Sequence, residues 1–200
     1  NEITSNYNGL TISSNNNLIQ NNNITNNTNY GIYIQGLNNN IIGNIINISP
    51  GIEGIFAENI NSNLLIDKNV IKGPTPSLKA CIEFYNVNQS NITSNNITGC
   101  YEGVLLRKSS YNTISYSNIS NNSNANIVLA KVEEGTPKET FRSTHTLVKG
   151  NIISQSNMGI YLIDSMNNRV INTLILDNTN AIVFSNGTGK SPYSDDNVVQ

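Results

Sequence analysis

The sequence predicts an all-β fold, a single-stranded parallel β-helix (solenoid) of about eight coils of 22–23 residues, with insertions in coils 3, 6 and 8. Three observations lead to this fold class. A repeating unit recurs along the whole chain, its apolar residues alternate, and no stretch has an apolar period of 3.6 residues long enough for a helix. Isoleucine, a β-branched residue suited to strands, dominates the apolar positions. Stacked coils would therefore bury one continuous column of isoleucine.

The first strand of each coil is the clearest part of the unit. The unit opens, usually with glycine, and continues with two apolar residues that flank one variable position, a pattern typical of a strand with one buried face. We expect Phe84 to stack over Ala57, because a large side chain beside a small one keeps the column at native packing density. The eight units begin at Gly9, Gly31, Gly54, Cys81, Gly103, Asn126, Gly159 and Ala181.

Two further strands follow in each coil. About nine residues after the first strand comes another apolar position, and four residues later an asparagine followed by an apolar residue, as in Ile19 with Asn23-Ile24, Leu65 with Asn69-Val70 and Leu147 with Asn151-Ile152. About 40 of the 200 residues are asparagine. Asparagine tolerates the left-handed backbone that bends require, and stacked asparagines can pass amide hydrogen bonds along the axis. We therefore expect asparagine ladders at the bends.

Three segments interrupt the repeat and are predicted to be surface insertions: residues 73–79, the charged stretch from Lys131 to Arg142, and residues 186–196. The last two follow the first strand of their coils, so both should leave the rod at one corner. We expect them to form two walls of a cleft, with Tyr161 and Asp164 at its floor. An aromatic floor between polar walls suits a sugar ring.

Composition excludes several classes of function. Charged residues make up 12% of the chain and the net charge is −2, against roughly 25% charged residues in an average domain. A nucleic-acid partner would need a basic patch, and a membrane span would need an apolar run of about 18 residues. Cys81 and Cys100 match no metal-ligand spacing, and they could form a disulfide in an oxidising compartment or remain two buried thiols. We expect no metal site and no cofactor.

The repeats resemble a known family. Gly31-Ile-Tyr-Ile followed by Asn40, and Gly159-Ile-Tyr-Leu followed by Asn167-Asn168, resemble repeats of right-handed parallel β-helix proteins of the pectate-lyase-like superfamily. They are similar above all to carbohydrate-binding and sugar-hydrolase repeat domains, which include a periplasmic protein of nitrous-oxide reductase maturation, and to archaeal adhesin-like surface proteins. The resemblance implies a right-handed helix. It does not imply copper handling here, because copper prefers clustered His, Met or Cys ligands and the chain has one histidine, His145, far in sequence from Met158 and Met166.

Candidate binding residues lie on the outward side of the first strands. The position between the two buried residues is apolar or aromatic in most coils, where solvent contact would favour polar side chains. This stripe consists of Thr11, Tyr33, Phe56, Glu83, Leu105, Val128, Tyr161 and Val183. Loops could cover it, it could bind sugar rings or a protein partner, or it could have no functional significance.

A polar group lies beside the stripe, two positions further along the strands, and consists of Glu58, Tyr85 and Arg107. Glu58 and Glu83 should be diagonal neighbours. Paired carboxylates can act as acid and base in glycoside hydrolysis, and an arginine can neutralise a uronate. Incidental surface ion pairs are the alternative interpretation. The predicted ligand-binding set is Tyr33, Phe56, Glu58, Glu83, Tyr85, Arg107, Tyr161 and Asp164.

The leading functional hypothesis is a non-enzymatic extracellular or cell-surface module for adhesion, carbohydrate contact or assembly. The alternative is a polysaccharide-active lyase, hydrolase or epimerase that uses Glu58, Glu83 and Arg107. Expected partners are a polysaccharide or glycoprotein, or further copies joined end to end. Residues 1–8 look like the last third of a coil, and the chain stops soon after a second strand. Residues 1–200 are therefore expected to be one β-helix domain from a longer solenoid.

Overall fold

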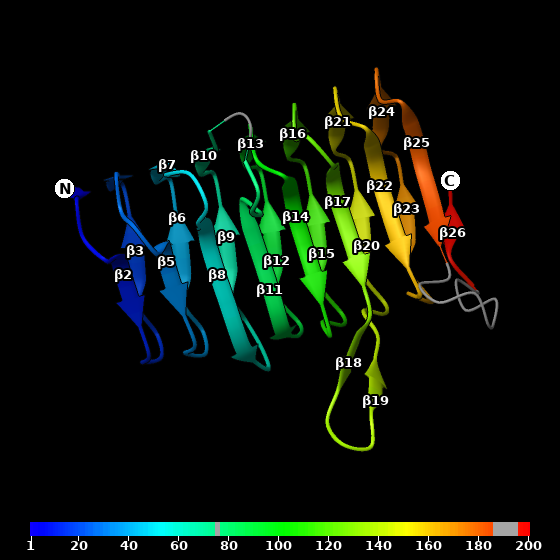
Figure 1. Ribbon diagram of the computed structural model, residues 1–200, viewed down its shortest axis with the longest axis horizontal. Coiled ribbons are helices and arrows are strands. Elements are labelled where there is room, and N and C mark those ends of the chain that lie inside the picture. The colour runs from blue at the N-terminus through cyan, green and yellow to red at the C-terminus, as the bar shows by residue number, and fades with distance from the viewer. Residues whose placement is uncertain (75–76, 186–195) are drawn as a thin grey trace.

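The computed structural model describes residues 1–74, 77–185 and 196–200. Three parallel sheets of eight strands each run along a rod, and one short hairpin projects from it (Figure 1). No described residue is helical, as the sequence predicts. No helix in these ranges has the length and apolar character needed to cross a membrane.

Each sheet collects one strand from each coil, and a coil is numbered here by its strand in the first sheet. The first sheet contains β2 (Asn8–Ile12), β5 (Tyr30–Ile34), β8 (Glu53–Ile60), β11 (Ile82–Val87), β14 (Glu102–Arg107), β17 (Ala125–Ala130), β22 (Met158–Ile163) and β25 (Asn180–Ser185).

The second sheet contains β3 (Leu18–Gln20), β6 (Asn40–Ile42), β9 (Leu65–Asp67), β12 (Asn91–Thr93), β15 (Thr113–Ser115), β20 (Leu147–Lys149), β23 (Arg169–Ile171) and β26 (Val198–Val199). The third contains β1 (Glu2–Thr4), β4 (Asn23–Thr25), β7 (Ile45–Asn47), β10 (Val70–Lys72), β13 (Asn96–Thr98), β16 (Asn118–Ser120), β21 (Ile152–Ser154) and β24 (Leu174–Leu176). As predicted, residues 1–8 include a third-sheet strand, and the last described strand belongs to the second sheet.

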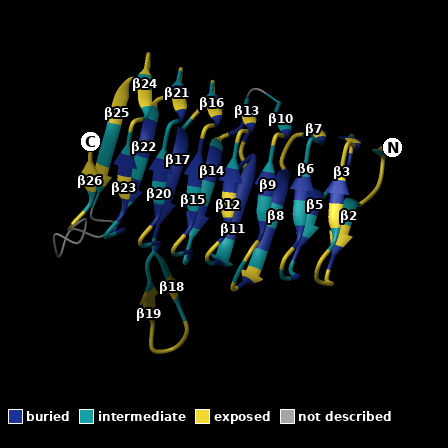
Figure 2. Ribbon diagram, turned by 180° about the vertical axis from the view of Figure 1, so that it is seen from behind, coloured by how far each residue is buried: buried dark blue, intermediate teal, exposed yellow. Residues whose placement is uncertain are grey.

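The core is a column of aliphatic side chains enclosed by the three sheets, and burial is concentrated there (Figure 2). Phe84 lies opposite Ala57 and both are fully buried, which confirms the predicted pairing of large with small. The predicted register of the second and third strands is wrong in two coils. Ile66 and Ile71, not Leu65 and Val70, are the fully buried residues of β9 and β10.

The same shift of one residue occurs in coil six, where Val148 and Ile153 face the core in place of Leu147 and Ile152. The reason lies in the bend. Asn151, like Asn69 in coil three, does not begin the following strand but occupies a buried position in the bend before it. The prediction aligned Asn69 and Asn151 with Asn23, which begins its strand, and this slip of one residue reverses which side chains are expected to face inward.

Each bend between a second-sheet strand and the following third-sheet strand contains two neighbouring residues with different roles. The first residue adopts a left-handed backbone, as at Asn21, Gly43, Lys68 and Ser94. The next is a buried asparagine, at positions 22, 44, 69 and 95, and these form a ladder along the rod. The predicted asparagine ladder is thus present in these four coils, although the left-handed backbone is carried by the preceding residue.

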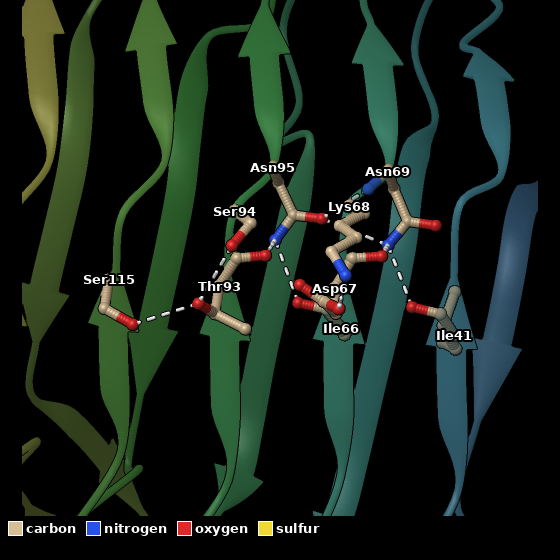
Figure 3. A network of polar contacts seen from close by, with 9 residues as sticks. All are labelled: Ile41, Ile66, Asp67, Lys68, Asn69, Thr93, Ser94, Asn95 and Ser115. Carbon is tan, nitrogen blue, oxygen red and sulfur yellow. Dashed lines mark hydrogen bonds and ion pairs between the residues drawn. The ribbon is translucent and has the colours of Figure 1, made fainter.

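Hydrogen bonds in this ladder run from coil to coil. The backbone N–H of Asn44 donates to Asn69 Oδ1 at 2.8 Å, and that of Asn69 donates to Asn95 Oδ1 at 2.9 Å. Asn69 Nδ2 donates to the Ile41 carbonyl at 2.9 Å, an arrangement repeated at Asn95 (Figure 3). Ser117 interrupts the asparagines but continues the chain of bonds, since its hydroxyl accepts from the Asn95 backbone N–H. Buried backbone donors at the bends are thereby satisfied.

Two features stand apart from the repeat. Cys81 and Cys100 form a disulfide, which decides between the two states the sequence left open. The charged insertion of coil six forms a hairpin of β18 (Val132–Glu134) and β19 (Glu139–Phe141) that extends beyond the ends of the strands (Figure 1). Residues 75, 76 and 186–195 of the other two insertions lie outside the described residues.

Candidate functional site

The outward stripe of the first sheet has the register that the sequence predicts. Tyr33 lies opposite Phe56, Phe56 opposite Glu83, and Glu83 opposite Leu105. Tyr30, which precedes Gly31, joins Tyr33 and Phe56 to form an aromatic cluster with centroid separations of 5.3 to 5.9 Å and interplanar angles of 12° to 24°. All three rings are partly exposed. They form a nearly parallel platform across coils two and three.

Glu58 lies at the edge of this aromatic cluster. Its Oε1 accepts hydrogen bonds from the Tyr33 hydroxyl and, at 2.7 Å, from Gln35 Nε2. Burial and the hydrogen bond to Glu58 raise the pKa of Tyr33 to about 12. The tyrosine therefore stays protonated and continues to donate to the carboxylate at physiological pH. The Glu58 carboxylate thus holds the hydroxyl edge of Tyr33, and with it this side of the aromatic platform, in place.

Glu83 is held by different residues. It faces outward, yet only 5% of it is exposed, and its carboxylate accepts a hydrogen bond from the Arg107 guanidinium on the next coil. The guanidinium carbon also lies 5.3 Å from the centroid of the Tyr85 ring. The structure thus brings together Glu83, Tyr85 and Arg107. Glu58 is diagonal to Glu83, as predicted, because Tyr85 lies opposite Glu58.

A further row of side chains on the outer side of the first sheet was missed by the sequence analysis. Glu53, 7% exposed, binds Lys79 Nζ at 2.8 Å. The hydrogen bond that Lys79 donates to the Glu53 carboxylate raises the pKa of Lys79. Burial, followed by the negative charge of Glu53, raises the pKa of Tyr30. The missed signal was positional, since Tyr30 and Glu53 each directly precede the glycine that opens a unit.

Glu102 belongs to the same row, because it directly precedes Gly103, the glycine that opens the fifth unit. Burial raises its pKa, although a hydrogen bond from Asn124 Nδ2, 3.0 Å from its carboxylate, acts in the opposite direction. The nearby charge of Glu83 also raises the pKa. Glu102 therefore retains a proton to higher pH than an ordinary glutamate, close to a carboxylate that is paired with arginine.

Tyr161 and Asp164 form a separate group on coil seven. Four coils separate Tyr161 from Phe56, or about 19 Å at the spacing of neighbouring strands. Asp164 is 5% exposed and binds Lys131 Nζ at 2.7 Å, and this contact raises the pKa of Lys131. Tyr161 packs with Val128 in an outward apolar cluster.

The prediction of a cleft over Tyr161 is wrong for the first of its two walls, the charged insertion of coil six. The coil-six hairpin extends beyond the strand ends rather than over the stripe (Figure 1). The hairpin contacts Lys108, the residue that follows β14: Lys108 Nζ binds Glu134 at 2.8 Å and lies 3.8 Å from the centroid of Phe141. One ion pair and one cation–π contact thus join the hairpin to Lys108 of coil five. The second predicted wall, residues 186–195, lies outside the described residues.

Two family models match the chain. The model of the right-handed β-helix region matches residues 75–200, and the model described as periplasmic copper-binding protein (NosD) matches residues 1–137. No curated protein matches the chain.

Solved structures show the same architecture. The A-module of the mannuronan C-5 epimerase AlgE4 from Azotobacter vinelandii has a TM-score of 0.77 at 17% identity, over 93% of this chain and 56% of that one. DFA-IIIase from Arthrobacter chlorophenolicus A6, without its lid and in complex with GF2, gives 0.74 at 17% identity, over 99% and 52%. The periplasmic alginate epimerase AlgG gives 0.62 at 21%, over 81% and 37%. The chain spans about half the length of the first two structures.

The residues present do not fit a copper site. Both cysteines are bonded to each other, and the ring of His145 stacks on Tyr111 while its Nδ1 lies 3.0 Å from the Thr144 hydroxyl. Among the described residues, no three His, Cys, Asp or Glu side chains are grouped as metal ligands. The donor set that copper prefers is thus not assembled in this part of the chain.

The three parallel sheets agree with these comparisons, and the two family models together reach from residue 1 to residue 200. The chain therefore belongs to the NosD and right-handed β-helix families, which are right-handed parallel β-helices of the pectate-lyase-like superfamily.

Proposed function

We propose that this protein is a non-enzymatic module that binds an extended polysaccharide along its first sheet, outside the cytoplasm. The observation that carries the proposal is the aromatic cluster of Tyr30, Tyr33 and Phe56, partly exposed and edged by the Glu58 carboxylate. Aromatic rings pack against the apolar faces of sugar rings, and carboxylates accept hydrogen bonds from sugar hydroxyls. The cluster therefore offers both kinds of contact that a sugar unit needs.

The charges of this face favour a neutral polysaccharide. Lys79 binds Glu53, and Arg107 binds Glu83. Both cations are thereby compensated by nearly buried carboxylates, and a charged ligand would have to compete with them. A neutral chain can stack on the rings without breaking either pair.

The ligand is expected to lie along the rod. The stripe continues over eight coils with strands about 4.8 Å apart, so a polymer could contact several coils at once. Repeated weak contacts along one face add up to a useful affinity. Binding should therefore increase with ligand length until the ligand spans the platform.

The comparisons support a carbohydrate and a location outside the cytoplasm. AlgE4 and AlgG are named as mannuronan and alginate epimerases, and DFA-IIIase was solved with GF2. The NosD model and AlgG are both described as periplasmic. The Cys81–Cys100 disulfide is the independent observation from this chain, because disulfides persist in oxidising compartments. We propose that the protein lies outside the cytoplasm and works in the extracellular space or at the cell surface.

The experiment compares two single variants of the platform. Tyr33→Ala and Phe56→Ala should each weaken binding at least ten-fold to a neutral polysaccharide selected from a panel and measured by calorimetry. Tyr161→Ala is the matched control, since Tyr161 is an outward aromatic of the same sheet four coils away. Loss of binding in Tyr161→Ala alone would move the site to coil seven, in favour of the Tyr161–Asp164 floor.

A polysaccharide-active enzyme is the second candidate, and the environment of Glu102 favours it. A carboxyl with a raised pKa can protonate a leaving oxygen while a neighbouring carboxylate acts as base or nucleophile. Glu102 has such a raised pKa, and the charge of Glu83 contributes to the shift. Turnover of any polysaccharide in the panel, detected as new reducing ends, unsaturated products or epimerised units and abolished by both Glu102→Gln and Glu83→Gln, would replace the binding hypothesis. The Glu58→Gln variant tests the remaining carboxylate.

End-to-end assembly of copies is a separate prediction. Strand edges at the ends of the described sheets could pair with another copy. Sedimentation at increasing protein concentration tests it without reference to the carbohydrate site.

A further inference from the structure

We propose a second binding site, on the second sheet at coils five to seven, that takes a sugar unit carrying a negative charge. It is formed by the exposed rings of Tyr111 and Tyr116 and by the cations Lys149 and Arg169. This site lies on a different sheet from the aromatic cluster of Tyr30, Tyr33 and Phe56, and it does not depend on the function proposed there.

The two tyrosines occupy positions that the fold does not reserve for aromatic residues. They flank β15, and each has a left-handed backbone, with φ of 59° at Tyr111 and 52° at Tyr116. The equivalent residues of the preceding coil are Gln89 and Ser94. Bulky side chains are disfavoured in this conformation. The bends therefore do not require tyrosine at either position, which points to a role other than forming the bend.

Both rings are exposed but held in place by the next coil. Tyr111, 59% exposed, stacks on His145 with centroids 4.6 Å apart and an interplanar angle of 13°. Tyr116, 62% exposed, lies against Gly150, where an added Cβ would come within 2.8 Å of the ring. Rings fixed before binding lose little conformational freedom when a sugar stacks on them. The two ends of β15 thus carry two oriented stacking surfaces.

The cations of this surface are uncompensated, in contrast to those of the first sheet. Within residues 1–74, 77–185 and 196–200, neither Lys149 nor Arg169 forms an ion pair, and Lys149 Nζ lies 5.5 Å from the Tyr116 ring centroid. Lys79, Arg107 and Lys131 all bind carboxylates. The second sheet therefore has positive charge available for an anion.

A surface hollow places the arginine beside the stacked rings. It is lined by His145, Thr146, Leu147, Asn167 and Arg169, from coils six and seven. Leu147 lies opposite Arg169 in the sheet, and the His145 backbone N–H donates to the Met166 carbonyl on coil seven. The hollow thus begins where His145 meets Tyr111 and ends at the guanidinium. An anionic group in it would reach Arg169 while its sugar ring contacts the His145–Tyr111 edge.

The ligand chemistry follows from these groups. A guanidinium matches the two oxygens of a carboxylate or of a sulfate ester, and a tyrosine ring matches the apolar face of a pyranose. The shared requirement is a negatively charged sugar unit, and a uronate is the occupant that we select because its carboxylate is coplanar with a single guanidinium in a bidentate contact.

The test uses oligogalacturonate, with a neutral oligosaccharide of equal length and a sulfated oligosaccharide as further arms. The Lys149→Gln/Arg169→Gln double variant should weaken oligogalacturonate binding at least ten-fold by calorimetry. Tyr111→Gln and Tyr116→Ser, which introduce the residues of coil four, should each weaken it several-fold. Lys68→Gln is the matched control, since Lys68 occupies the same bend position as Tyr116 in coil three and lies 3.7 Å from Asp67.

Several results would overturn this site. Unchanged oligogalacturonate binding by the double variant is one. Equal binding of the sulfated ligand with no effect of either tyrosine variant would reduce the site to a cation patch. Loss of binding in Tyr33→Ala, with the double variant unaffected, would assign the acidic ligand to the first sheet. Far-ultraviolet circular dichroism and thermal unfolding of each variant confirm that the rod is folded.

Discussion

The carboxylate of Glu83 on β11 is almost completely buried on the outside of the first sheet, because the Arg107 guanidinium of β14 covers and neutralises it. An outward side chain of a solenoid is normally solvated. Here the pair joins coils four and five and also forms part of the proposed binding face. Its stability contribution can be separated from ligand binding by mutation.

Arg107→Gln should lower the free energy of unfolding by about 2 kcal/mol. Removing one partner of a fully buried pair costs about 3–5 kcal/mol, and the cost is smaller here because the Arg107 side chain is 40% exposed. Urea denaturation at neutral pH measures the change. Glu83→Gln/Arg107→Gln should recover most of the loss, since no unpaired charge remains. A double variant as unstable as Arg107→Gln would contradict the explanation.

Asn69→Ala should destabilise the rod by about 3 kcal/mol. The substitution removes the acceptor of the Asn44 backbone N–H and the donor to the Ile41 carbonyl, and each buried polar group left unsatisfied costs about 1–3 kcal/mol. Asn23→Ala is the matched control, because Asn23 is exposed on β4 and should change stability by less than about 0.5 kcal/mol. Equal effects in denaturant unfolding would remove the ladder as a source of stability.

Glu102 should make the protein less stable as pH rises. Burial raises its folded-state pKa above the ordinary value of 4.5, so the folded state holds the proton more tightly than the unfolded state between the two pKa values. The slope of unfolding free energy against pH is negative in that window. Glu102→Gln should therefore melt at a higher temperature than the wild type at pH 7, and the difference should vanish below pH 4.5. A constant difference at both pH values would show that Glu102 acts through packing instead.

The Cys81–Cys100 disulfide should stabilise coils four and five. It links residues 19 apart in sequence, and closing a loop of this size contributes about 3 kcal/mol in the chain-entropy model. Cys81→Ala/Cys100→Ala should lose about that amount in guanidinium unfolding under oxidising conditions. Adding a thiol reductant should bring the wild type to the same stability and leave the variant unchanged. A variant as stable as the oxidised wild type would exclude a structural role.

The sequence by itself determined the fold and much of the candidate face. Because the unit recurs every 22–23 residues, equivalent positions of successive coils stack on one another. The row from Tyr33 through Phe56 to Glu83 therefore followed directly from the alignment of the units. The pairing of Phe84 with Ala57 followed in the same way. When parallel coils stack in register, the position of a residue within its unit fixes its neighbours along the axis.

Only the tertiary structure decided which polar groups satisfy one another and which residues face inward at the bends. A one-residue shift exchanges Leu65 for Ile66 in the core, and sequence periodicity is weakest where strands contain three residues. The bond from Tyr33 to Glu58 and the stack of Tyr111 on His145 join side chains 25 and 34 residues apart. Such contacts depend on rotamers and on the length of each insertion. The repeat therefore determined the rod, and the lateral packing of its coils decided the sites.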